Sequence, residues 1–308
     1  MPAPFPINPV YTGIAIAYKN KMMIADDVLP RVPVGKEEFK YTKYKLEDGF
    51  TVPDTKVGRK SKPNEIEFDS TEITDSTEDY GLDDPIPQKD LDNAAEYNDP
   101  RSQSVENLSN IIELGREVRA ANLVFNAASY AAANKQVLSG ASQFSDFANS
   151  DPIGVIMNAL ENMIMFGNVI TFGQQVWTKF RQHPDIIKAT NGNSGDKGVA
   201  ARQAVAELFE VEEILVGVAR INASKKGQSP SLAQAWGKHI SIMHRDKTAN
   251  TRNGTTFGFT AQFGGRIAGS IIDPNIGLKG GERVRVGEMV KELLPANDLG
   301  YFIEDAVA

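Results

Sequence analysis

A chain of 308 residues with no cysteine and a net charge of -7 excludes disulfides, thiolate metal sites and cysteine nucleophiles, and it argues against general nucleic-acid affinity. No apolar run approaches the roughly 20 residues that span a bilayer, and the N-terminus does not match a secretory signal. The length favours one elaborate domain or two modest ones. These features are typical of an intracellular protein and leave its function open.

The N-terminal region, residues 1–45, predicts an extended arm. Five prolines interrupt the first 30 positions and block long regular elements. Residues 39–46 then alternate aromatic side chains with lysines, which predicts a strand with Phe39 and Tyr41 on one face.

Residues 46–98 are strongly acidic toward their end. Between Ser61 and Pro100 there are 13 Asp or Glu residues against two Lys, and a strand-like piece at 66–74 has Ile66 and Phe68 on one face. One interpretation is a solvated acidic loop. The alternative is a long two-stranded excursion that lies on another subunit, because an isolated hairpin is marginal in water and needs a partner.

A long amphipathic helix is predicted from Asp99 to about residue 135. Asp99 can cap the helix and Pro100 suits its first turn. The predicted inner face has residues at spacings of three and four: Val105, Leu108, Ile112, Gly115, Val118, Asn122 and Phe125. We expect Leu108, Ile112, Val118 and Phe125 to pack on a sheet that the C-terminal strands complete. About 35 residues would span about 50 Å.

The remaining sequence interleaves helices and short strands. We first expect a helix from Asp151 ending at Gly167, a buried strand at 168–173, and a helix at 174–189 broken near His183 and Pro184. A flexible loop at 191–198, a helix at 199–209, and strands at 212–221 and 238–244 should follow. A glycine-rich stretch at 254–281 then separates these elements from closing strands at 283–294 and 299–308. This order predicts an α+β fold with mixed sheets.

Residues that could support catalysis are few. Of the three histidines, His239 and His244 are five positions apart on an expected strand, so they point to opposite faces and are poorly placed to share a metal. The third, His183, stands beside a helix break. The sequence has neither a zinc-protease motif nor a Cys/His cluster.

Other candidate motifs are incomplete. The loop around Gly195, Asp196 and Lys197 lacks the phosphate-binding pattern, and Gly264-Gly265 lacks the surroundings of a dinucleotide fingerprint. Acid pairs such as Asp83-Asp84 and Glu212-Glu213 are expected in a chain with 40 acidic residues. We therefore assign no catalytic, cofactor-binding or metal-binding residue and predict that the protein is not an enzyme.

Three segments carry a resemblance. Between Asp151 and Thr190 a capped helix leads into a short apolar strand and a second helix, with Trp177, Phe180, His183, Pro184 and Asp185 as the distinctive residues. This segment resembles the major capsid proteins of tailed bacteriophages with the Hong Kong 97 fold. Residues 206–224 are similar to the family's helix followed by a strand ending in Val-Gly, and residues 281–308 are similar to its closing strands.

The resemblance implies a domain order. Residues 1–45 would be the N-terminal arm, 46–98 the extended loop, 99–198 the peripheral domain with its long spine helix, 199–250 the axial domain, and 251–308 the return to the peripheral sheet. The family's covalent lysine–asparagine crosslink has no match, although Lys56, Lys60 and Lys62 are present. No helical scaffold segment is predicted before the arm, which implies a separate scaffolding protein or a removed leader.

The resemblance also implies a function. The chain would assemble with itself as hexamers and pentamers into an icosahedral shell that encloses double-stranded DNA. Its partners would be a scaffolding protein, a portal protein and, where present, a decoration protein. It would be found in the virion after assembly in the host bacterial cytoplasm, without a membrane and without a cofactor.

Three classes stay open, and the phage capsid protein is the first. A bacterial nanocompartment shell would have the same fold but enclose protein cargo, and the content of the particle discriminates the two. An enzyme or another virion protein is the third class. Sequence-specific DNA readout needs a basic element that enters a groove, and Lys225, Lys226, Lys238 and Arg245 are better explained as solvated charges of loops and strand ends.

Overall fold

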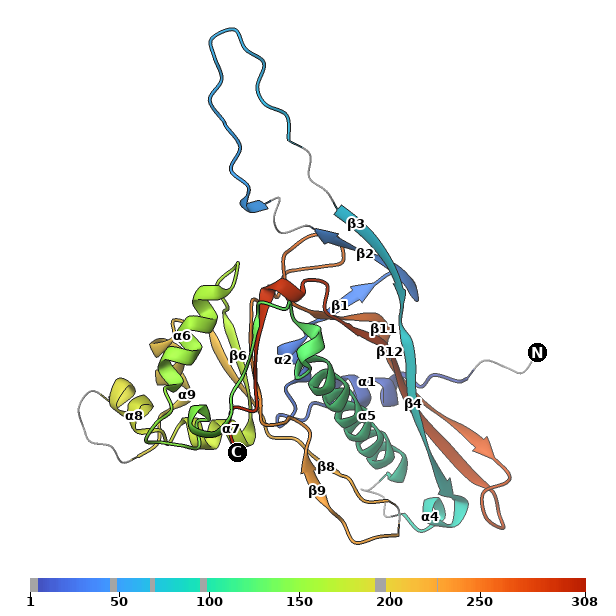
Figure 1. Cartoon of the computed structure of the whole chain (residues 1–308). Coiled ribbons are helices and arrows are strands. Elements are labelled where there is room, and N and C mark those ends of the chain that lie inside the picture. Colours follow the sequence, from blue (N-terminus) through green and yellow to red (C-terminus); the bar gives the residue numbers. More distant parts are fainter. Residues whose placement is uncertain (1–4, 45–48, 67–69, 95–98, 192–197, 226) are drawn as a thin grey trace.

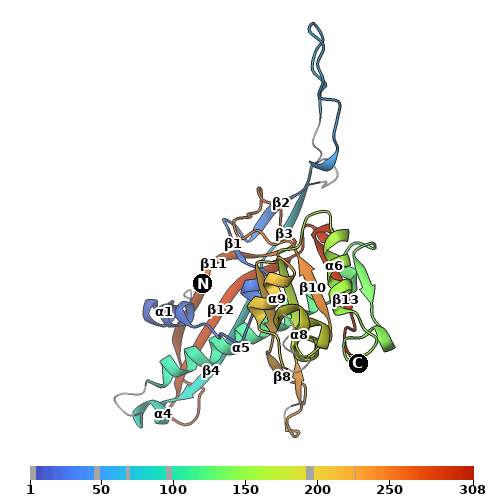
Figure 2. The same cartoon turned by 90° about the vertical axis from the view of Figure 1, so that its left-hand side faces the viewer.

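The computed structural model describes residues 5–44, 49–66, 70–94, 99–191, 198–225 and 227–308 (Figure 1). It has helices and mixed sheets, which confirms the α+β prediction. One sheet has four strands in the order β1–β11–β12–β4, and the other has five in the order β5–β13–β10–β6–β7. A long helix lies beside both sheets, and a narrow excursion projects from one end of the molecule (Figures 1 and 2).

The four-stranded sheet is built on a long hairpin. Its strands are β1 (Arg31–Val34), β11 (Phe259–Asp273), β12 (Gly281–Leu293) and β4 (Glu78–Pro87), with β1 parallel to β11 and the other pairs antiparallel. The prediction that residues 254–281 only separate other elements was wrong, because most of this stretch forms β11. Gly264, with φ 67°, permits the bulge at which the β11–β12 register shifts.

Helix α5 (Pro100–Val124) covers one face of this sheet. The Asp99 carboxylate accepts the backbone N–H groups of Arg101 and Ser102, so the predicted cap is confirmed. Leu108 and Ile112 pack against Val284 and Val286 of β12, as predicted. Helix α1 (Pro9–Ala17) lies against α5 and β11.

The helix is shorter than predicted and ends at Val124 rather than near residue 135. The Ser129 Oγ donates to the Leu123 carbonyl at 2.6 Å, and the Tyr130 Oη donates to the Val124 carbonyl at 2.7 Å. These side chains satisfy carbonyls that a further turn would have used. Phe125 is therefore a half-buried cap residue that packs on Trp236 and Phe302, not on the four-stranded sheet.

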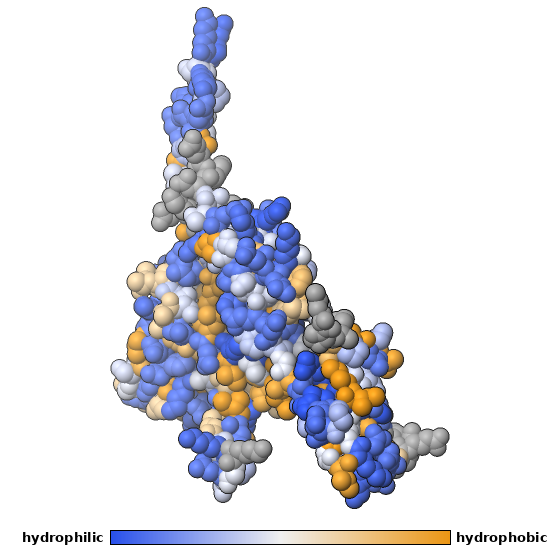
Figure 3. Space-filling model, turned by 90° about the vertical axis from the view of Figure 1, so that its right-hand side faces the viewer, coloured by the Kyte–Doolittle hydropathy of each residue, from blue (hydrophilic) through white to orange (hydrophobic). Residues whose placement is uncertain are grey.

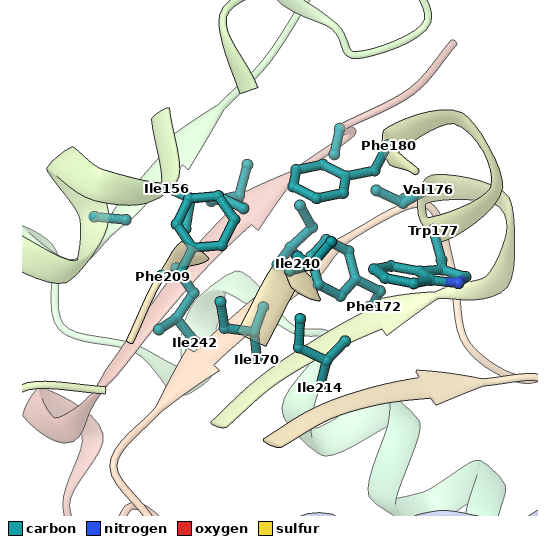
Figure 4. Close-up of a cluster of buried hydrophobic side chains, with 14 of the residues drawn as sticks. Ile156, Ile170, Phe172, Val176, Trp177, Phe180, Phe209, Ile214, Ile240 and Ile242 are labelled. Atoms are coloured by element: carbon teal, nitrogen blue, oxygen red, sulfur yellow. The ribbon is translucent and has the colours of Figure 1, made fainter. Parts of the chain in front are cut away.

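The five-stranded sheet is covered on both faces. Its strands are β5 (Lys135–Val137), β13 (Gly300–Glu304), β10 (Ile240–Met243), β6 (Val169–Gly173) and β7 (Glu213–Gly217). The side facing α6 to α9 has a core that includes Phe172, Trp177 and Phe180 (Figure 4). On the other side, alternate residues such as Leu215 and Phe302 pack with the C-terminal end of α5.

The helices over the five-stranded sheet are α6 (Pro152–Asn162), α7 (Gln174–Phe180), α8 (Pro184–Asn191) and α9 (Arg202–Leu208). The predicted Asp151 cap and the break at His183-Pro184 are confirmed. Helix α6 ends at Asn162, before the predicted Gly167. That glycine serves packing instead, because a Cβ there would lie 2.6 Å from the Ile242 Cγ2 atom.

Several small elements complete the fold. They are α2 (Ala25–Val28), β2 (Glu38–Tyr44), β3 (Ser70–Ser76), α4 (Gln88–Asp92), η1 (Ala127–Ser129), η2 (Gly140–Ser142), β8 (Arg220–Asn222), β9 (Leu232–Gln234) and η3 (Asn297–Leu299). The β2 strand is confirmed, with the Phe39 and Tyr41 rings 6.4 Å apart. Ile66 is exposed, whereas Phe68, its predicted partner on one face, lies outside the described residues.

Strand pairing also bears on the predicted segments. Strand β6 lies before residue 198, yet it pairs with β7 and β10, which lie after it, and β10 pairs with the C-terminal β13. The predicted boundary at 198 therefore falls inside the five-stranded sheet, and the closing strands β12 and β13 join different sheets. Among the described residues between 46 and 98, β4 belongs to the four-stranded sheet and residues 49–66 project from the body (Figure 2).

Candidate functional site

The three histidines lie in separate surroundings. Burial lowers the pKa of His183, whose Nε2 lies 3.1 Å from the Ser150 Oγ, and burial also lowers the pKa of His239, whose Nδ1 accepts the Asp305 N–H at 3.0 Å. The His244 Nδ1 lies 3.0 Å from the Phe166 carbonyl oxygen. Strand β10 begins after His239 and ends before His244. Both histidines therefore flank the strand and do not lie on it.

The residues of the other candidate motifs form ion pairs, hydrogen bonds or a bulge within the fold, or they lie outside the described residues. Asp83 pairs with Arg285, and Asp84 accepts a hydrogen bond from the Ser104 hydroxyl. Glu213 pairs with Arg245, and Gly264-Gly265 forms the β11 bulge. Gly195, Asp196 and Lys197 lie outside the described residues. Among the described residues there is no group of three or more His, Cys, Asp or Glu side chains placed to hold a metal ion.

The buried charges instead gather on helix α5. Its inner face continues from Leu108 and Ile112 through Glu113, Arg116 and Glu117, whereas the predicted Gly115 and Asn122 are exposed and Val118 is half-buried. The sequence does indicate that these positions lie on the inner face, because residues 109, 113 and 117 repeat at the helical spacing of the apolar stripe. Charged residues there were simply not expected to be buried.

These side chains are buried because residues 18–31, which we call the crossing segment, pass over the helix. The Glu113 carboxylate accepts the Asn20 N–H at 3.0 Å. The Glu117 carboxylate accepts the Ile24 N–H at 3.0 Å and the Ala25 N–H at 2.7 Å, and it also accepts the Trp236 indole N–H at 2.6 Å. Burial raises the pKa of Glu117, although these hydrogen bonds and the charge of Arg116 oppose the rise.

Arginines complete a charged cluster, defined here as Asp26, Arg31, Glu113, Arg116, Glu117, Arg266 and Glu288. The Glu288 Oε2 accepts from Arg31 at 2.9 Å and from Arg266 at 3.1 Å, and Arg266 also pairs with Glu113 at 2.9 Å. Arg116 pairs with Asp26 and donates to the Thr260 hydroxyl at 3.1 Å.

The pKa directions follow from this arrangement. Burial lowers the pKa of Arg116 to about 10, still well above neutrality. Burial would raise the pKa of Glu288, but Arg31 and Arg266 outweigh it and the net direction is downward. The cluster therefore fastens the crossing segment to α5 and to the β11–β12 hairpin. Breaking one member strands a partner charge in the interior.

Two hollows of about 220 and 410 Å³ flank the crossing segment, and both are lined by members of the charged cluster. The arrangement binds and positions chain segments, and it places no activated nucleophile. Arg245, one of the basic residues weighed for DNA contact, is 3% exposed and donates to Glu213 and to the Asp27 carbonyl, so it is not available to DNA. Lys226 lies outside the described residues.

The second candidate surface is the projecting part of the chain, residues 49–66, which we call the excursion. Its residues are exposed except Pro53, which is half-buried, and they include apolar Val52, 89% exposed. A turn closed by the Ser61 N–H and the Gly58 carbonyl at 3.0 Å forms near its middle. Figure 3 shows its outer end as a mostly hydrophilic projection that stands clear of the body. Such a segment fits contact with another molecule better than a role in its own subunit.

None of the described helices is both long and apolar enough to cross a membrane. No protein-family model matches the chain.

Comparison with known proteins identifies the family. A major capsid protein of Pseudomonas phage JBD67 is 58% identical over 306 residues, which is 99% of each chain. A major capsid protein of Burkholderia phage BcepMu is 28% identical over 313 residues, with 96% of this chain and 95% of the relative covered. A crystal structure of a phage-related protein from Bordetella bronchiseptica superimposes with a TM-score of 0.76 at 22% identity, covering 99% and 98% of the two chains. With this fold and this identity over its whole length, the chain belongs to the phage major capsid proteins of the Hong Kong 97 fold and is a structural component of the virion.

Proposed function

We propose that this capsid protein assembles as hexamers and pentamers into an icosahedral shell that encloses double-stranded DNA. The observation that carries the proposal is the excursion. Its 18 residues form two runs that reach roughly 30 Å at about 3.3 Å per residue. Apolar side chains stay exposed along it, and contact with neighbouring subunits would bury them. Interlocked contacts of about 3,000 Å² per subunit would make assembly obligate.

The proposal extends to the parts of the subunit. The four-stranded sheet with α5 would be the peripheral domain, since α5 is the spine helix and packs on β12. The five-stranded sheet with α6 to α9 would be the axial domain. Residues 1–45 would be the N-terminal arm, although α1, α2 and β1 lie on the body of their own subunit. Residues 46–98 would be the extended loop, with β4 as its return strand.

The proposed role is structural and not enzymatic. It is supported by the histidines, which have packing and hydrogen-bonding roles, and by the buried charges, which are tied to one another. A scaffolding protein and a portal protein are the proposed partners, a decoration protein could bind the outer surface, and assembly would take place in the host bacterial cytoplasm. DNA is favoured over protein cargo because both curated relatives are phage capsid proteins.

Negative-stain microscopy of the expressed chain, alone and with the phage's own proteins, tests this proposal. We expect closed shells, and from infected cells shells that hold nuclease-protected DNA. A matched variant would replace residues 51–64 by a short glycine linker, which should leave a folded subunit that does not close shells. Monomers of the natural chain under all conditions, or shells filled with protein cargo, would contradict it.

A further inference from the structure

A short hairpin formed by β8 and β9 concentrates positive charge in this acidic chain. Residues 214–245 contain five Lys or Arg residues and no Asp or Glu, although the net charge of the chain is -7. Arg220 and Lys225 of the hairpin, and Lys238 just after it, are exposed and form no ion pair with any described residue. The hairpin projects from the body on the side away from the excursion (Figure 1). We call residues 220–238 the basic hairpin.

The basic hairpin has a fixed shape although it stands out from the body. Its strands pair Arg220 with Gln234 and Asn222 with Leu232, and the Asn222 side chain accepts two backbone N–H groups of the turn at 3.1 and 3.0 Å. Residues directly opposite each other on two strands point to the same face, so Arg220 shares a face with Leu232, which is 65% exposed. Because an isolated two-stranded ribbon is marginal in water, this cationic and apolar face fits contact with another molecule.

The opposite charge gathers where β6 and β7 begin. Glu161 at the end of α6, and Glu210 and Glu212 before β7, are exposed and form no ion pair with any described residue. Ile164 and Phe166, which are 39% and 51% exposed, lie between α6 and β6. The backbone just before β6 accepts the Glu212 N–H at 2.9 Å, which holds the two approaches side by side. We call these five residues the acidic patch.

The basic hairpin and the acidic patch lie at opposite ends of the five-stranded sheet. In the parallel β6–β7 pair, Val169 lies opposite Glu213 at one end, and Gly173 lies opposite Gly217 at the other. The acidic patch comes before the first of these pairs and the basic hairpin follows the second. About 16 Å of strand therefore separates them. The two surfaces of one subunit are kept apart, and each is left open to a different molecule.

From this complementarity we infer that the basic hairpin of one subunit docks on the acidic patch of a second copy of the chain. Arg220 and Lys225 meet the carboxylates of the acidic patch. Leu232 covers Ile164 and Phe166. The contact joins two different surfaces, so it is heterologous, and repeated contacts of this kind close into rings when the rotation permits. This inference rests on the proposed self-assembly and specifies one of its contacts.

Charge exchange tests the pairing. The hairpin variant is Arg220→Glu/Lys225→Glu, the patch variant is Glu161→Lys/Glu212→Lys, and the third protein carries both sets. Light scattering measures the subunit concentration for half-maximal assembly, with circular dichroism as the check on folding. At low salt, where exposed charges are least screened, each single set should raise that concentration ~10-fold. The combined set should return it to within about 3-fold of the natural chain.

The matched control for the patch variant is Asp90→Lys/Glu106→Lys, at exposed positions of α4 and α5. It changes the net charge by the same amount and should leave assembly unaltered. Additive losses in the combined protein, or an equal loss in the control, would overturn the docking site.

The absence of cysteine from the chain permits a direct geometric test. In assembled particles, Leu232→Cys/Phe166→Cys treated with a short bismaleimide should give covalent multimers on a denaturing gel, because each link joins two subunits. The matched protein is Leu232→Cys/Ile272→Cys, since Ile272 in β11 is 80% exposed, and it should stay monomeric. Crosslinking of both proteins, or of neither, would overturn the docking site.

The remaining outcomes separate this contact from other functions. Failure of the natural chain to assemble would refute the proposed function. Normal assembly of every charge variant would refute only the docking of the basic hairpin. Retention of DNA by the free subunit that the hairpin variant abolishes would assign the basic hairpin to the genome rather than to a second copy.

Discussion

Between the five-stranded sheet and α7, Phe172, Trp177 and Phe180 form a core of apolar rings, with ring centres 5.0 to 6.2 Å apart. Between α5 and the four-stranded sheet, the interior is charged at the level of the crossing segment. There Glu288 is 2% and Arg266 6% exposed. Both regions are buried. The first is held by non-directional apolar packing, whereas the second is held by ion pairs and hydrogen bonds whose distances and angles must match.

The comparison suggests a division of roles. An apolar core tolerates changes that keep volume and pattern. A charged cluster specifies one arrangement, because each member left without its partner is costly. The crossing segment buries Ile24, Val28 and Leu29 in the apolar core. In addition, the carboxylates of Glu113 and Glu117 fix the path of its backbone by accepting N–H groups. The predictions below test this difference, beginning with the largest effect.

The apolar core should respond most strongly to loss of volume. Phe180 is fully buried and contacts four aromatic rings, so Phe180→Ala should lower the free energy of unfolding by about 3–5 kcal/mol. Urea unfolding of the free subunit measures the loss. Phe166→Ala is the matched control, because Phe166 is 51% exposed, and it should cost under about 1 kcal/mol. Similar losses at both positions would show that α7 is not a core element.

The charged cluster should behave differently when a partner is also changed. Arg266→Met removes the cation that Glu113 and Glu288 share, and we expect a loss of about 3 kcal/mol. Adding Glu288→Gln neutralises one stranded carboxylate and should recover part of that loss. Double-mutant analysis of urea midpoints gives the coupling. Strictly additive losses would mean that the cluster is a set of independent contacts.

The sequence and the structure agree best where capping and apolar spacing act alone. Asp99 and Asp151 mark helix starts because each is followed by proline and can accept N–H groups within its own turn. The helix end at Val124 depends on Tyr130 folding back, and the burial of Glu117 depends on Ile24 and Ala25, over 90 positions away. Strand β11 was missed because its glycine content hid a strand that β12 and β1 stabilise from both sides.

Two buried carboxylates should give opposite pH responses. Glu288 has a lowered pKa, so its stabilisation is present above the unfolded pKa and is lost as the pH falls. Glu117 has a raised pKa, so its contribution is greatest at low pH and is lost as the pH rises through the folded value.

Glu288→Gln should therefore cost most near neutrality, and Glu117→Gln should cost most in mild acid. The cost of Glu117→Gln should fall as the pH rises from about 4.5 to neutrality, whereas the cost of Glu288→Gln should fall only as the pH drops below about 4.5. Urea midpoints at about pH 3, about pH 4.5 and about pH 7 measure both changes, with Glu106→Gln on the exposed face of α5 as the control. Parallel slopes for the two buried positions would contradict the opposite electrostatic surroundings assigned to them.

The excursion differs from both buried regions. Its amides in residues 49–66 should exchange hydrogen rapidly in free subunits and slowly in shells, because only a neighbour can cover them. Residues 78–87 of β4 provide an internal control: they pair with β12 in the isolated subunit and should be protected in both states. Mass spectrometry of peptides from each segment resolves the two. Equal protection of the excursion in both states would mean that it folds on its own subunit.

The smallest expected effect is on DNA. Counterion release needs several Lys or Arg residues aligned on one surface, and in this chain Arg245 is tied to Glu213 while Arg116 and Arg266 are buried. The excursion adds three cations that form no ion pair with a described residue, Lys56, Arg59 and Lys60. Three are too few for retention near physiological salt, since each phosphate contact loses affinity steeply as salt rises. The free subunit should therefore show no measurable shift of a DNA fragment in a gel. A variant with Lys56→Glu, Arg59→Glu and Lys60→Glu in the excursion should behave identically, which separates a contact with a second subunit from a contact with DNA. Tight, sequence-selective binding that this variant abolishes would assign the excursion to the genome rather than to the neighbouring subunit.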